Sequence, residues 1–162
     1  MTSNQSLNPD DWFVHDFYLG KSCEHDDGQN IDTITGAEII LVGVSRTSKT
    51  PTCIYLANQG IKAANIPLVP NQELPKLNGN KKNLSVIALI TTPQNLVEVR
   101  KKRAIELGLD PKKDEYTNIN SVTKEINEAK KIFNKMGWPT IDTTRRSVEE
   151  TAAAIMSIRA QK

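Results

Sequence analysis

Short apolar runs alternate with helix-like segments along most of the chain. The runs are short and rich in β-branched residues, as expected of buried strands, and they cover residues 39–42, 61–66, 84–90 and 139–143. The run at 84–90 is apolar enough to be covered on both faces of a sheet. Helices are expected between and after these runs, at 50–59, 92–108, 119–136 and from 147 onwards. This alternation predicts an α/β fold with a mostly parallel sheet flanked by helices.

The segment at 119–136 has the clearest helical periodicity in the chain. Its apolar residues recur at intervals of three and four, and they are Ile119, Val122, Ile126, Ala129, Phe133 and Met136. One buried face is expected, and a length of under three heptads favours packing on the core over a coiled-coil seam. Capping signals support two other helices, because Thr92 precedes Pro93, and Ser147 with Glu150 forms a capping box. The inward residues of the last helix are expected to be Val148, Ala152 and Ile155.

The first apolar run leads into a glycine and a polar loop. Gly43, Lys49 and Thr50 match the phosphate-binding pattern Gly-x4-Gly-Lys-Ser/Thr, with Ser48 in place of the second glycine. In such a loop the glycine turns the chain off the strand, amides wrap a phosphate, the lysine neutralises it and the hydroxyl reaches Mg²⁺. A Cβ at position 48 resists a left-handed backbone, so a looser wrap is expected; the alternative is an ordinary turn with a chance lysine. The predicted nucleotide-binding residues are Gly43, Val44, Ser45, Arg46, Thr47, Ser48, Lys49 and Thr50, with Thr50 also the metal ligand.

Polar residues lie at or near the carboxyl ends of the expected strands, where open α/β sheets bind their ligands. These segments are Gly43–Thr50, Asn65, Thr91 with Thr92, and Asp142–Arg146. Arg145 and Arg146 precede the last helix, where a cation is unfavourable unless an anion is bound, so we expect at least one of them to clamp phosphate. Exposed surface arginines are the alternative. Arg46 is a candidate third cation, whereas Arg100 and Arg103 are expected to be exposed on their helix.

The segment Glu24-His25-Asp26-Asp27-Gly28-Gln29 offers groups for acid–base chemistry. Adjacent side chains point in different directions, so their spacing alone cannot make a metal triad. One account is a turn before Gly28. The other is that Asp27 or Asp26 serves as a general base or Mg²⁺ ligand with His25 as a helper, which requires this segment to fold against the phosphate loop.

Charge and composition narrow the function classes. The formal net charge is +2 with both signs interspersed, so no broad nucleic-acid or membrane surface is implied. Cys23 and Cys53 lack metal-type spacing and are expected to be free buried thiols, as suits a reducing cytosol. No run approaches the length of a membrane helix. We expect a cytoplasmic protein with a partly disordered leader at 1–23 and one domain at 24–162.

Taken together, six segments resemble the pyruvate, phosphate dikinase regulatory protein family. The resemblance runs from about Glu24 to the C-terminus and rests on His25–Gln29, Gly43–Pro51, Tyr55–Asn58, Pro67–Pro70, Gly137–Pro139 and Thr144–Ala152. It implies a bifunctional serine/threonine enzyme. As a kinase, such an enzyme uses ADP and Mg²⁺ to phosphorylate an active-site threonine of the dikinase. As a phosphorylase, it removes that phosphate with inorganic phosphate and releases pyrophosphate.

The resemblance also assigns roles to the candidate residues. Asp27, with Asp26 second and His25 as helper, would orient the threonine hydroxyl for the kinase reaction. The β-phosphate of ADP would lie at Lys49 and Thr50 with Mg²⁺. In the reverse direction one anion attacks another, so cations are required, and these would be Arg46, Lys49, Arg145 and Arg146.

The sequence also departs from the family pattern. Members normally carry a substantial N-terminal α/β portion before the His-Asp-Asp-Gly segment, where a short aromatic-rich leader stands here. A sister branch acts on phosphoenolpyruvate synthase and has Cys-Gly at the place of Thr47-Ser48, so this loop favours the dikinase branch. Three functions stay open: an active regulator, a truncated nucleotide-binding remnant without catalysis, and a small-molecule kinase that prefers ATP. A homodimer also stays open.

Overall fold

The structure, a computed structural model, describes residues 37–69, 74 and 84–161. Within that part the strands are β1 (Ile39–Gly43), β2 (Ala63–Pro67), β3 (Ser85–Ile90) and β4 (Thr140–Asp142). The helices are α3 (Lys49–Asn58), α4 (Pro93–Glu106), α5 (Ile119–Met136) and α6 (Val148–Ala160), with a short 3-10 helix η1 (Glu115–Thr117) before α5. The strands form one parallel sheet in the order β2-β1-β3-β4, which confirms the predicted α/β class.

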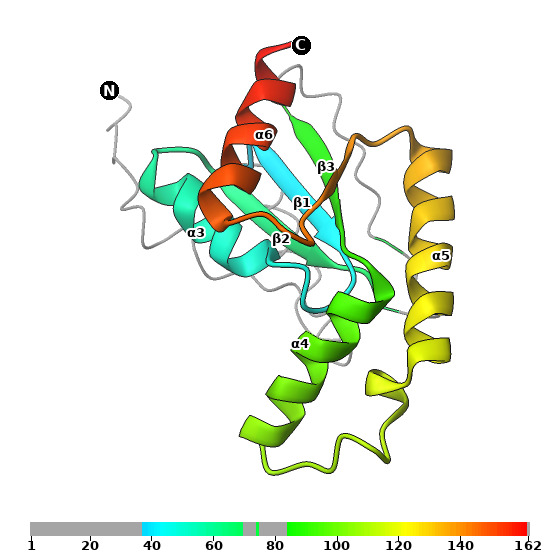
Figure 1. The fold of residues 1–162 in the computed structure, drawn as a ribbon. Coiled ribbons are helices and arrows are strands. Elements are labelled where there is room, and N and C mark those ends of the chain that lie inside the picture. The colour runs from blue at the N-terminus through cyan, green and yellow to red at the C-terminus, as the bar shows by residue number, and fades with distance from the viewer. Residues whose placement is uncertain (1–36, 70–73, 75–83, 162) are drawn as a thin grey trace, which may run out of the picture.

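Helices cover both faces of the sheet (Figure 1). On one face, Ile40 and Val42 of β1 pack in a core with residues of α4 and α5. On the other face, Ile39 and Leu41 pack in a second core with residues of α3 and α6. The alternation along β1 therefore divides the domain into three layers, and all five residues of this strand are buried.

The predicted periodicity of α5 is confirmed in its middle and is wrong at its ends. The inward residues Val122, Ile126, Ala129 and Phe133 are buried in the core that also holds α4. Ile119 and Met136 are 42% and 51% exposed, because they occupy the first and last positions of a helix that is longer than the core it covers. In α6, Ala152 and Ile155 are buried as predicted, whereas Val148 at its first position is only half-buried.

The start of β2 also differs from the prediction. The strand begins at Ala63 instead of Ile61, because the amide of Ile61 donates to the carbonyl of Leu56 and completes the end of α3. Gly60 adopts a φ of +80° at this stop, which is a backbone conformation that glycine adopts without strain. Ile61, which was predicted to begin this strand, therefore belongs to the C-terminal end of α3.

An ion pair ties the amino end of the sheet to the last helix. Glu38, just before β1, accepts a hydrogen bond from Arg159 of α6 at 2.8 Å and another from the amide of Lys62 at 2.9 Å. Partial burial raises the pKa of Glu38, but the Lys62 amide and the Arg159 guanidinium outweigh it and hold the pKa below its ordinary value. Cys53 is buried, as predicted, and among the described residues the longest and most apolar helices still fall short of a membrane span.

Candidate functional site

The loop between β1 and α3, residues 44–48, has a backbone suited to an anion. Arg46 and Ser48 have φ angles of 69° and 63°, in the left-handed region that residues with a Cβ enter only under constraint. Ser48 therefore adopts the conformation that its Cβ was expected to resist. Within the described ranges, the backbone amides of Arg46 and Ser48 donate to no other residue. Turns of this kind bring successive amides together around a concavity that binds anions.

Gly43 is required at the end of β1 for a reason that differs from the predicted one. Its φ is not positive, so no special turn is made there. A Cβ on Gly43 would lie 2.6 Å from the carbonyl oxygen of Leu89 in β3 and 2.8 Å from the hydroxyl of Thr47. The glycine thus lets the loop lie directly against the neighbouring strand.

We expect Gly43→Ala to destabilise the domain and to disturb the loop. The added methyl group meets backbone, which cannot swing aside, so a loss of about 1–3 kcal/mol in the free energy of unfolding is expected from overpacking. Urea unfolding measures this loss of stability, and titration with pyrophosphate measures the affinity of the loop for a diphosphate. Gly60→Ala is the comparison, since a Cβ there has nothing within 4 Å and meets only backbone strain. Equal pyrophosphate affinities in the two variants would contradict this account of Gly43.

The ammonium group of Lys49 lies against the β1–α3 loop. The residue is only 5% exposed, and its Nζ donates to the carbonyl of Val44 at 2.7 Å and to the Thr47 hydroxyl at 3.4 Å. The Thr47 hydroxyl in turn donates to the same carbonyl at 3.0 Å. The ammonium group is therefore held beside the loop backbone at the N-terminus of α3, where the helix dipole also favours a negative charge.

Thr50 is held by a neighbouring strand. Its hydroxyl oxygen accepts a hydrogen bond of 3.0 Å from the side-chain amide of Asn65, a buried residue in the middle of β2. A hydroxyl oxygen can accept a second bond, so this arrangement fits the role of one Mg²⁺ ligand beside phosphate oxygens and waters. Among the described residues no group of three or more His, Cys, Asp or Glu side chains could hold a metal. Within this part of the chain, Thr50 is therefore the one predicted metal ligand whose surroundings can be described.

A cleft of 920 Å³ opens beside the loop. One wall consists of the loop and the start of α3, including Arg46 and Lys49. The lining continues on α4, η1 and α5 with Val99, Glu115, Tyr116, Ser121, Lys124, Glu125 and Glu128. The cleft thus has Arg46 and Lys49 beside the loop, and three carboxylates with the single cation Lys124 on η1 and α5, so phosphate is favoured on the loop side.

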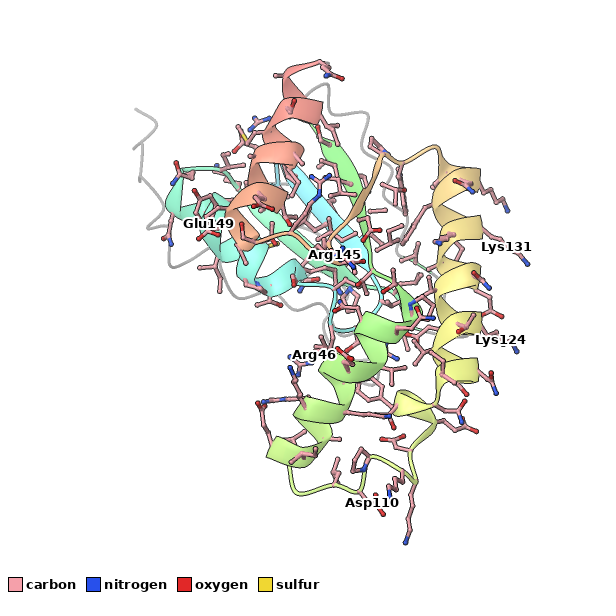
Figure 2. The ribbon with its side chains drawn as sticks, viewed as in Figure 1. Arg46, Asp110, Lys124, Lys131, Arg145 and Glu149 are labelled. Atoms are coloured by element: carbon pink, nitrogen blue, oxygen red, sulfur yellow. The ribbon has the colours of Figure 1, made fainter. Side chains whose placement is uncertain are left out.

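Arg145 and Arg146 lie between β4 and α6, outside the lining of the cleft. Both side chains are exposed, and neither lines the cleft. Figure 2 shows Arg145 on the segment that precedes α6, and Arg46 at the loop beside α4. The predicted cations therefore divide into Arg46 and Lys49 at the cleft and an arginine pair outside it.

A hydroxyl network fixes the segment that carries this arginine pair. The Thr144 hydroxyl lies 3.2 Å from the Thr91 hydroxyl after β3 and accepts a bond of 3.1 Å from the amide of Thr92. A carboxylate oxygen of Asp142 accepts from the Thr144 amide at 2.9 Å. The ends of β3 and β4 are thus joined at the carboxyl edge, as the convergence of the polar segments predicted.

Arg100 contradicts the prediction that it is exposed. Its exposed fraction is 1%, and both of its terminal nitrogens bond Glu125 of α5, at 2.8 and 3.0 Å. Helical spacing could have revealed this position, because Arg100 lies three residues after Val97 and four before Ala104, which are both buried. Arg103, by contrast, is 44% exposed, as predicted.

Several predicted residues lie outside the part of the chain that the structure describes. These are His25, Asp26 and Asp27, together with the leader at 1–23, which includes Cys23. Their assignment stays a prediction. Tyr116 and Glu125 are site residues that the sequence reasoning missed, because nothing in their local sequence distinguishes them from other surface positions.

Comparison with known proteins gives the family. The family model described as Kinase/pyrophosphorylase matches residues 21–156. A protein of Pelagibacter ubique, named as a pyruvate, phosphate dikinase regulatory protein, is 56% identical over 135 residues, which cover 83% of this chain and 49% of that protein. Proteins of the same name from Bartonella bacilliformis and Nitrobacter winogradskyi are 47% and 43% identical, over 98% and 99% of this chain and 56% and 57% of their own lengths.

The chain thus spans about half the length of the curated relatives it matches. The family model, in contrast, covers most of the chain, and the similarity includes the β1–α3 loop and the segment before α6. The resemblance drawn from the six sequence segments is thereby confirmed. This chain belongs to the kinase/pyrophosphorylase family.

Proposed function

We propose that this chain carries the phosphate-transfer site of a regulator of pyruvate, phosphate dikinase that uses ADP as its donor. The observation that supports this most is the buried ammonium of Lys49 inside a left-handed loop at the carboxyl edge of the sheet. A diphosphate placed there would meet backbone amides, a helix N-terminus and a cation together. An ordinary surface turn has no reason to bury a lysine.

In the kinase direction the β-phosphoryl group of ADP moves to a threonine hydroxyl. The bond between the β-phosphorus and the bridging oxygen breaks, AMP leaves, and the hydroxyl proton passes to a base, for which Asp27 is our first candidate and Asp26 the second. Lys49 would hold the β-phosphate, and Thr50 would supply one ligand to Mg²⁺, which neutralises the phosphate oxygens when bound. Arg46 at the mouth of the cleft would add positive charge.

In the phosphorylase direction inorganic phosphate attacks the phosphothreonine. An oxygen of the attacking phosphate bonds to the phosphorus, and the bond between that phosphorus and the threonine oxygen breaks. The threonine oxygen takes up a proton, and pyrophosphate is released as the product. Two anions must approach each other, so this direction depends on cations more than the forward one does. We assign this role to Lys49 and Arg46, with Arg145 or Arg146 reaching in from the segment before α6.

A second candidate is a nucleotide-binding module without phosphate transfer. The fact that favours it is the coverage, because this chain matches only about half of each curated relative. In this candidate the other half of the relatives' length would dock the dikinase, whereas the loop described here needs only this sheet. Both candidates predict that the chain binds ADP, but only the first predicts that phosphate is transferred to the dikinase.

The deciding experiment incubates the purified chain with intact dikinase and with ADP labelled on its β-phosphate. We expect label on a threonine of the dikinase, release of AMP, and loss of that label as pyrophosphate when inorganic phosphate is added. Binding of ADP without any transfer would favour the second candidate. Transfer from ATP to a small molecule, or transfer to phosphoenolpyruvate synthase instead of the dikinase, would assign the chain to another function.

A further inference from the structure

We infer that Arg100 is a positioning residue that sets the shape of the β1–α3 loop from α4, the helix against which the loop lies. The inference deepens the proposed function, because it concerns the same loop. It rests on the contacts of Arg100 with Ser45, Tyr116 and Glu125, which join the loop to η1 and α5.

Ser45 is held at two points. Its carbonyl oxygen accepts a hydrogen bond of 3.3 Å from a terminal nitrogen of Arg100, and its hydroxyl lies 2.7 Å from the hydroxyl of Tyr116. Tyr116 is itself fixed by Arg100, which donates to its carbonyl at 3.2 Å and lies 4.2 Å from the centre of its ring. The loop is therefore anchored by one buried guanidinium and one half-buried phenol that support each other.

Because the peptide group is planar, fixing the carbonyl of Ser45 also fixes the direction of the Arg46 amide. The peptide bond between Ser45 and Arg46 is trans and planar, so the amide of Arg46 points opposite to the carbonyl of Ser45. Because Arg100 holds that carbonyl towards α4, the amide faces away from α4. It has no hydrogen-bond acceptor among the residues that the structure describes. Arg100 thus presents one of the amides that would receive a phosphate.

A contribution to stability does not by itself explain why Arg100 is buried. Burying a guanidinium and a carboxylate costs solvation, and apolar residues of similar volume often replace such a pair without loss. Moreover, the Nε of Arg100 is buried without a hydrogen-bond partner in the described part of the chain. A group that is costly to bury and yet bonds the backbone of the loop is better explained by a role in shaping that loop.

The experiment compares three variants of the full chain by amide hydrogen exchange and by ADP titration. Tyr116→Phe keeps the ring and removes only the hydroxyl that meets Ser45. Arg100→Lys keeps the charge and loses the planar fork that reaches three partners. Arg103→Lys is the matched control, because Arg103 lies one turn later on α4 and its side chain is 44% exposed. Unfolding temperatures are measured for all three, so that global instability is separated from a local change.

We expect faster exchange in residues 44–50 without any nucleotide, by about threefold in Tyr116→Phe and tenfold or more in Arg100→Lys, and ADP affinity should fall in the same order. Arg103→Lys should match the unaltered chain. Unchanged exchange of the loop in both test variants would overturn the inference. Faster exchange in a protein that never binds ADP would leave the positioning role standing and would count against the proposed function instead.

Discussion

Replacing Lys49 by methionine should abolish phosphate transfer while the domain stays folded. Methionine has a similar length and can occupy the same buried position, but it brings no charge to the loop. Removing one preorganised donor from a transferring group typically lowers turnover by about 10²–10³-fold, or roughly 3–4 kcal/mol in the barrier. We expect at least this loss in both directions, since under the proposed function the ammonium would serve the β-phosphate and the attacking phosphate alike. Transfer of labelled phosphate to and from the dikinase is the measurement.

The control for this prediction is Lys102→Met, which removes a lysine from the exposed side of α4. It should leave turnover and the affinity for ADP within about twofold of the unaltered chain. Thermal unfolding of both variants shows whether a loss of turnover reflects the site or the fold. Turnover retained in Lys49→Met would mean that the lysine only fills the loop, and the proposed role of the site would then be wrong.

Glu125→Ala should cause the largest loss of stability that we predict. Glu125 accepts two hydrogen bonds from a guanidinium that is 1% exposed, so its removal leaves a buried positive charge without its counterion. Breaking a buried pair in this way typically costs about 3–5 kcal/mol. The exposed fraction of the Glu125 side chain is 16%, so water can partly compensate, and we expect about 3 kcal/mol. Urea unfolding followed by circular dichroism measures it.

Glu128→Ala is the matched control on the same helix. Glu128 is exposed and lies 4.0 Å from Lys124, an exposed pair of the kind that contributes little. Its removal should change the free energy of unfolding by no more than about 0.5 kcal/mol. If the free energy of unfolding fell equally in the two variants, the buried pair of Arg100 and Glu125 would contribute no more than an exposed ion pair.

The succession of strands and helices along the chain could be predicted because each element has a local signature, whereas the order of the strands within the sheet could not. The apolar run at 39–42, the proline after Thr92 and the three-four spacing of α5 all reflect interactions within one element. The parallel sheet then follows from their alternation. The same locality explains the errors at helix ends, where Ile119 continues the apolar pattern but extends beyond the core.

The site was predicted less completely because its main contacts link separate elements. The close approach of Gly43 to Leu89 is a contact between strands, so the sequence suggested a turn instead. Arg100 was assigned to the surface by residue type, although its spacing from Val97 and Ala104 places it inward. Tyr116 comes from a connecting segment whose position depends on how α4 and α5 pack. Such contacts become visible only when the layers are assembled.

The Glu38–Arg159 pair and the β1–α3 loop lie at opposite ends of the same strand. The five residues of β1 separate them by about 16 Å at the usual rise of a strand. Glu38 is thus one contributor to the fold that lies away from the loop. A more heat-resistant form could be sought by redesigning the Glu38 end alone, with the loop left in its native sequence.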